Sequence, residues 1–208
     1  MKERACILVG MLLISALIPL TASAGDPNDP EVTDRIRDVR GFFGLIPRAL
    51  IPQFFLKHVD IQSAWFYEDS NNPDYLSISL KVRDLEVKLS DNEQKTYDTI
   101  YTVRWYLNDE FYVSGLHVFS DGHITEYSVG KESDENYFVL CQGTFEEQEN
   151  IITWLVPKDG IGNPQPGDVL LRPWAWIGIR IIDNDTGNYG GELVKDWTSE
   201  GREYTIQY

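Results

Sequence analysis

The stretch Leu76-Ser77-Ile78-Ser79-Leu80-Lys81-Val82-Arg83 alternates strictly between apolar and polar side chains. Successive side chains of a β-strand point to opposite faces of a sheet, whereas the faces of a helix repeat with a longer period. A period of two over this stretch therefore predicts a half-buried strand whose apolar side chains face a core.

Similar runs lie on both sides of this strand, separated by turn residues such as Asp121-Gly122. They cover residues 59–65, 101–107, 111–119, 123–129, 137–145, 151–156, 169–182 and 203–207. Short strands at this spacing are typical of antiparallel sandwiches. The sequence predicts an all-β fold, a jelly-roll-like antiparallel β-sandwich of about nine strands. A short apolar helical or turn segment at residues 42–56 is expected to cap one end.

The N-terminus has the three parts of a secretory signal. Lys2 and Arg4 precede an apolar run at residues 5–20, and Ala22-Ser23-Ala24 supplies small residues for cleavage. We predict a signal peptide at 1–24, an acidic, loosely docked lead-in with the apolar cap at 25–58, and the sandwich domain at 59–208. The product is then secreted or extracytoplasmic, in the cell envelope, and an uncleaved N-terminal anchor is the alternative.

The chain carries a formal net charge of −15 at pH 7. Such a surface repels nucleic-acid phosphates and anionic lipid headgroups. We therefore expect no nucleic-acid partner, and no membrane span after cleavage of the signal. Cations and neutral ligands such as glycans suit this charge better.

Cys141 is the only cysteine that remains after cleavage of the signal, so no intrachain disulfide is expected. It lies in an apolar, strand-like run, which predicts a buried and unreactive thiol. An intermolecular disulfide is the alternative.

The sequence contains neither a G-x-S-x-G nor an H-E-x-x-H hydrolase motif. It has three histidines, and His117 and His123 are predicted to point to opposite faces of one hairpin. We therefore assign no catalytic residue. The many acidic side chains leave a carboxylate-dependent hydrolase open as an alternative.

A loop near the C-terminus suggests calcium. Asp183, Asp185 and Glu192 offer carboxylate oxygens, the first two at alternate positions of a Gly/Asn/Asp-rich loop. This spacing departs from that of an EF-hand loop, so a solvated turn is the alternative. The acidic segment 26–34 is a second candidate for a cation. Calcium is accordingly the one cofactor that the sequence suggests.

The long strand predicted at residues 169–182 carries two tryptophans at a period of two. Its expected core face consists of Val169, Leu171, Ala175, Ile177, Ile179 and Ile181. The opposite face then holds Arg172, Trp174, Trp176 and Arg180, a flat aromatic platform flanked by arginines on which a sugar ring can stack. Pro173 predicts a bulge or an edge within this strand. Alternatively, that bulge swaps the faces, or other residues cover the platform.

Four segments carry a family resemblance, namely residues 73–85, 101–107, 152–158 and 162–168. They resemble a family of uncharacterised secreted β-sandwich domains found in archaeal and bacterial exported proteins. The architecture is similar to that of family 9 carbohydrate-binding modules and DOMON domains. The resemblance implies export and a sandwich fold, with glycan or cation binding by analogy.

The leading functional prediction is a non-catalytic extracellular β-sandwich module that binds a glycan or another cell-surface ligand. The second is a structural, envelope-associated interaction protein whose aromatic patch is a protein interface. The third is the carboxylate-dependent hydrolase.

Overall fold

The structure, a computed structural model, describes residues 26–35, 38–41, 53–85, 95–133, 138–183 and 189–208. The predicted signal peptide lies outside these residues, and so does most of the predicted apolar cap. Within the part of the chain that is described, no helix has the length and apolar character needed to cross a membrane.

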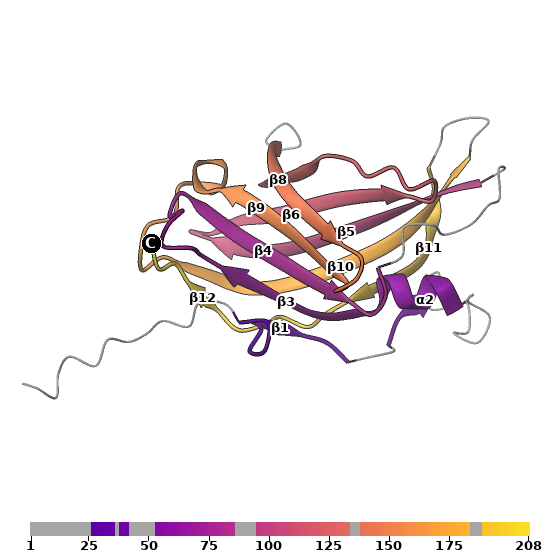
Figure 1. Ribbon diagram of the computed structural model, residues 1–208, viewed down its shortest axis with the longest axis horizontal. Helices are drawn as coiled ribbons and strands as arrows, with labels where there is room; N and C mark the ends of the chain where they lie inside the picture. Colours follow the sequence, from indigo (N-terminus) through magenta and orange to yellow (C-terminus); the bar gives the residue numbers. More distant parts are fainter. Residues whose placement is uncertain (1–25, 36–37, 42–52, 86–94, 134–137, 184–188) are drawn as a thin grey trace, which may run out of the picture.

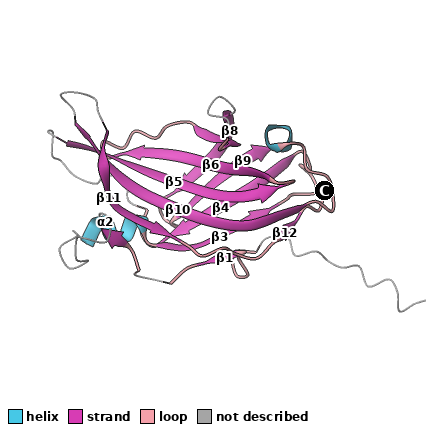
Figure 2. Ribbon diagram, turned by 180° about the vertical axis from the view of Figure 1, so that it is seen from behind, coloured by secondary structure: helices cyan, strands magenta, loops and turns pink. Residues whose placement is uncertain are grey.

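Strands dominate the described chain (Figures 1 and 2). They are β1 (Val32–Thr33), β2 (Arg40–Gly41), β3 (Ile61–Tyr67), β4 (Tyr75–Val82), β5 (Lys95–Leu107), β6 (Glu110–Phe119), β7 (Tyr127–Lys131), β8 (Phe138–Glu146), β9 (Ile151–Pro157), β10 (Val169–Asp183), β11 (Tyr189–Trp197) and β12 (Tyr204–Thr205). The helical elements described are α2 (Gln53–Val59) and the short 3-10 helix η3 (Lys158–Ile161). The predicted all-β class is confirmed. β3 to β10 and β12 correspond to the nine strands expected, whereas β11 was not predicted.

All twelve described strands belong to one antiparallel sheet. Their order is β1-β3-β4-β9-β8-β7-β6-β5-β10-β11-β2, with β12 paired to β10. The sheet curls, so that β3 and β4 lie across from β5 and β10 (Figure 1). Hydrogen bonding thus joins the strands into a single curled sheet, and the two separate sheets of a sandwich are not confirmed.

Aromatic contacts show that the two halves of the curled sheet enclose one core. The Phe66 ring on β3 meets the Trp105 ring on β5 edge-on, with centroids 5.8 Å apart. Trp154 Nε1 on β9 donates a hydrogen bond to the Gly115 carbonyl on β6 over 3.0 Å. The predicted alternation of β4 is confirmed, because Leu76, Ile78, Leu80 and Val82 are all fully buried.

Strand β8 joins the two halves. Its first part pairs with β7, where Cys141 faces Tyr127, and its second part pairs with β9, where Gln142 faces Leu155. A side chain at Gly143 would lie 2.3 Å from the Tyr127 ring and 2.5 Å from the Thr153 carbonyl oxygen. Glycine is therefore required where the sheet turns from one half to the other.

The acidic lead-in is packed against the sheet rather than loosely docked. β1 pairs with β3 and β2 pairs with β11, which places the lead-in at both ends of the strand order. Val32 and Val39 are buried. The described residues of the lead-in therefore lie at both edges of the curled sheet, and we call the place where these edges meet the seam. Figure 1 shows α2 beside β11.

A buried ion pair holds the C-terminal residues against β3. Lys158 Nζ lies 2.5 Å from Glu68 Oε1, and both side chains are almost completely buried. Glu68 Oε2 also accepts hydrogen bonds from the Tyr204 hydroxyl over 3.1 Å and the Gln207 amide over 2.7 Å. Lys158 Nζ donates in addition to the carbonyl oxygen of Tyr208.

The Cys141 thiol is half-buried on β8. Burial raises its pKa to about 11. Little thiolate is therefore present at neutral pH, which agrees with the unreactive thiol that the sequence predicts.

Candidate functional site

A bulge in β10 sets the position of the predicted tryptophan platform. The pairing of β10 with β5 shifts between Leu171 and Trp174, on either side of Pro173, as that proline predicts. Arg172 occupies the bulge with a φ of 49°, in the left-handed region.

Because of this bulge, the buried residues of β10 differ in part from those predicted. Ala175, Ile177 and Ile179 are fully buried, as expected, but Leu170 is buried before the bulge in place of Val169 and Leu171. An extra residue in a strand moves every preceding side chain to the other face. The predicted face is thus correct from Ala175 to Ile179 and inverted before Pro173, while Ile181, also expected in the core, is only partly buried.

Trp174 and Trp176 lie on the outer face of β10, and the structure adds a third tryptophan beside them. Trp197 on β11 is the direct register partner of Trp176. The Arg104 guanidinium on β5 lies 4.8 Å from the centroid of Trp174 and 5.8 Å from that of Trp176. We define the aromatic face as these three tryptophans with Arg40, Arg104 and Lys195.

Cations also pack against the third tryptophan, Trp197, near the edge of the sheet. The Arg40 guanidinium on β2 lies 4.4 Å above the Trp197 ring, and Lys195 Nζ lies 5.7 Å from it. Arg104 and Arg40 lie on strands next to those of the tryptophans that they contact, and Lys195 lies on the same strand as Trp197. The rings and cations therefore connect β5, β10, β11 and β2.

Gly178 leaves room for the Trp176 ring against the backbone of β10. A Cβ atom at position 178 would come within 2.6 Å of the six-membered ring of Trp176. The indole therefore occupies the space beside the backbone that a side chain at position 178 would fill.

Arg104 is held in place by polar contacts as well as by the rings. Its Nη1 lies 3.0 Å from Glu132 Oε1, and its Nε donates to Thr102 Oγ1 over 3.4 Å. Burial lowers the pKa of Arg104, and the Glu132 carboxylate opposes this change. A partly desolvated guanidinium is a strong donor toward hydroxyl or carboxylate groups of a ligand.

The two arginines predicted to flank the platform differ in position. Arg180 shares the outer face of Trp176, opposite Glu192 on β11. Arg172 projects from the bulge, where its Nε lies 3.9 Å from Glu200 Oε2, with both side chains exposed. Arg172 also lines a cavity of about 290 Å³ together with Tyr106, Asp109 and Leu171.

The residues predicted to bind calcium are only partly described. The side chain of Asp183 and the whole of Asp185 lie outside the described residues. Glu192 forms an ion pair with Lys195 on the same strand, with Oε2 and Nζ 3.0 Å apart. In the acidic segment 26–34, Asp29 pairs with Arg202 over 2.7 Å.

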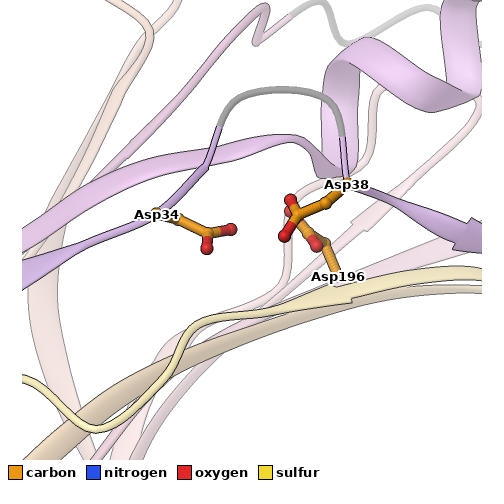
Figure 3. Close-up of side chains that lie close together, drawn as sticks. All are labelled: Asp34, Asp38 and Asp196. Atoms are coloured by element: carbon orange, nitrogen blue, oxygen red, sulfur yellow. The ribbon is translucent and has the colours of Figure 1, made fainter.

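Three carboxylates meet at the seam of the curled sheet (Figure 3). One oxygen each of Asp34, Asp38 and Asp196 lie within 4.8 Å of one another. Asp196 is only 2 % exposed, and its Oδ2 accepts a hydrogen bond of 3.0 Å from the Ile61 amide on β3. We call this group the seam cluster.

Burial and mutual repulsion oppose the ionisation of all three carboxyl groups in the seam cluster. Burial raises the pKa of Asp196 to about 8, and the neighbouring carboxylates add to the rise. Burial likewise raises the pKa of Asp34. A fourth carboxylate nearby, on the fully buried Asp60, pairs with Arg83 over 3.3 Å.

The sequence did not predict all members of the aromatic face or of the seam cluster. The outward position of Arg104 follows from the alternation at residues 101–107, but its approach to β10 depends on strand order. Nothing local in the sequence connects Asp34 with Asp196.

Comparison with protein-family models, with curated proteins and with solved structures finds no match to this chain.

Proposed function

We propose that this protein is a non-catalytic, exported module that binds glycans through the aromatic face. The observation that carries the proposal is the grouping of Trp174, Trp176 and Trp197 on one outer surface with Arg104 beside the first two rings. The export part of the proposal rests on the signal-like N-terminus.

The chemistry of the aromatic face suits a sugar. The C–H groups on one side of a pyranose ring stack on a flat indole, and guanidinium donors bind hydroxyl or carboxylate oxygens. The cavity at the bulge, about 290 Å³, provides a further polar contact through Arg172 and Asp109. Because these groups belong to paired strands, the surface is arranged before the ligand arrives, which lowers the entropic cost of binding.

Replacing Trp176 by alanine is expected to weaken glycan binding by about fivefold or more, since stacking on one ring contributes on the order of 1 kcal/mol. A glycan array on the purified protein identifies the ligand, and isothermal titration with that glycan measures the loss. Gly178→Ala is a second variant, which keeps the indole but displaces it from the sheet.

Tyr67→Ala is the matched control, because Tyr67 is 40 % exposed and lies on β3, away from the aromatic face. Circular dichroism establishes that each variant is folded. Equal affinity of the wild-type protein and the Trp176→Ala and Gly178→Ala variants would contradict the proposal, as would an array without any bound glycan.

A role as an interaction protein is the second candidate, favoured by one observation. Phe138 and Leu140 on β8 are 46 % and 58 % exposed and point to the same side of the strand. If this pair is an interface between copies of the chain, light scattering should detect a dimer that Leu140→Ser converts to a monomer. A monomeric wild-type protein would exclude this form of the second candidate.

A further inference from the structure

The seam cluster lies where the two ends of the strand order come together. Asp34 follows β1, which pairs with β3, and Asp38 precedes β2, which pairs with β11. Asp196 belongs to β11 and reaches the backbone of β3 at Ile61. The cluster thus draws its side chains from both edges of the curled sheet.

The burial of two carboxyl groups in this cluster, Asp196 and one oxygen of the half-buried Asp34, points to a ligand. Oδ2 of Asp34 is inaccessible to solvent and has no hydrogen-bond partner among the described residues. Asp196, almost completely buried, is directed toward the same space (Figure 3). A buried carboxylate oxygen without a partner is costly, so it is expected to have a ligand that the protein atoms do not supply.

The donor set identifies the class of that ligand. When all three groups are ionised, carboxylates with oxygens this close repel one another, and a cation placed between them removes the repulsion. All donors are hard oxygens, and the group contains neither histidine nor cysteine, which disfavours zinc and other soft-ligand metals. Calcium accepts irregular sets of carboxylate and water oxygens more readily than magnesium does.

We propose that Asp34, Asp38 and Asp196 bind one divalent cation of the calcium type, which clamps the two edges of the curled sheet. This site is distinct from the one that the sequence predicts at Asp183, Asp185 and Glu192. The cation joins Asp34 and Asp38 of the lead-in to Asp196 of β11. Because Asp196 precedes Trp197 and Asp38 lies two residues before Arg40, the clamp also supports one end of the aromatic face.

The test is a thermal melt of the purified protein, first in EDTA and then in calcium. With a dissociation constant near 0.1 mM, 10 mM calcium is expected to raise Tm by roughly 5–10 °C. Isothermal titration of the EDTA-treated protein with calcium chloride should give one site per chain. The measurement is independent of glycan binding, so failure of one proposal does not affect the other.

Asp196→Asn should abolish the rise in Tm, since asparagine still accepts the Ile61 amide but loses the charge. Asp38→Asn is the second variant, and because Asp38 is exposed its replacement leaves the core intact. Glu192→Gln is the matched control and should keep the full response.

Two results would overturn the proposal. One is the absence of a calcium-dependent rise in Tm and of binding heat in the wild-type protein. The other is a rise that survives in Asp38→Asn and Asp196→Asn but disappears in Glu192→Gln, which would assign the cation to the loop between β10 and β11.

Discussion

Replacing Glu68 by glutamine is expected to lower the free energy of unfolding by about 3–5 kcal/mol. The side chains of Glu68 and Lys158 are 0 % and 5 % exposed, and their charged atoms lie 2.5 Å apart. The substitution leaves the Lys158 ammonium buried without its counter-ion. It also weakens the hydrogen bonds that Glu68 accepts from the Tyr204 hydroxyl and the Gln207 amide.

Urea unfolding followed by tryptophan fluorescence measures this loss. The matched control is Glu200→Gln, which removes the partner of Arg172 from a pair whose side chains are 63 % and 68 % exposed. Exposed pairs contribute at most about 1 kcal/mol, so this control should unfold almost like the wild-type protein. Similar small losses in both variants would show that the Glu68–Lys158 pair is solvated.

Replacing Phe66 by alanine is expected to cost about 3–5 kcal/mol, the range for deleting a buried aromatic side chain. Phe66 is fully buried between the halves of the curled sheet. Its ring centroid lies 5.8 Å from that of Trp105 on β5 and 5.6 Å from that of Tyr204 on β12. The substitution therefore removes contacts to two strands that are distant in the sheet order.

The neighbouring Tyr67 is the control for this experiment, because it belongs to the same strand but is 40 % exposed. Tyr67→Ala should cost much less than Phe66→Ala in the same urea titration. If the two variants lose equal stability, β3 does not pack its Phe66 face against β5, and the curled arrangement is wrong.

The strands of this protein could be predicted because their signal is local. Leu76, Ile78, Leu80 and Val82 alternate with polar residues, and all four are fully buried in the structure. Proline cannot donate the hydrogen bond that a regular ladder requires, so the sequence predicted a bulge or an edge at Pro173, and the structure has the bulge. The outward positions of Trp174 and Trp176 follow from the same alternation.

The face of β10 before Pro173 could not be predicted in the same way. A bulge shifts the alternation by one residue, but the sequence does not reveal on which side of the proline the extra residue falls. Leu170 is consequently buried where Val169 and Leu171 were expected.

The strands with which each strand pairs could not be predicted from local sequence patterns either. Alternation indicates that a strand has an inner and an outer face, but many strand orders satisfy the same pattern. Arg104 reaches Trp174 because β5 pairs with β10, and Trp197 faces Trp176 because β10 pairs with β11. The aromatic face was therefore predicted as two tryptophans, and its third ring and its central arginine were missed.

By itself, the sequence determined the all-β class, most strand positions, the bulge at Pro173 and the outward tryptophans, because each depends on residues that are neighbours along the chain. The tertiary structure alone decided that the strands form one curled sheet, that Arg104 lies between the tryptophans of β10 and the carboxylate of Glu132, and that Asp34, Asp38 and Asp196 meet at the seam. These features depend on closing the sheet, which brings its first and last strands together. The alternation of apolar and polar residues along the chain does not indicate which edges of the sheet meet in space.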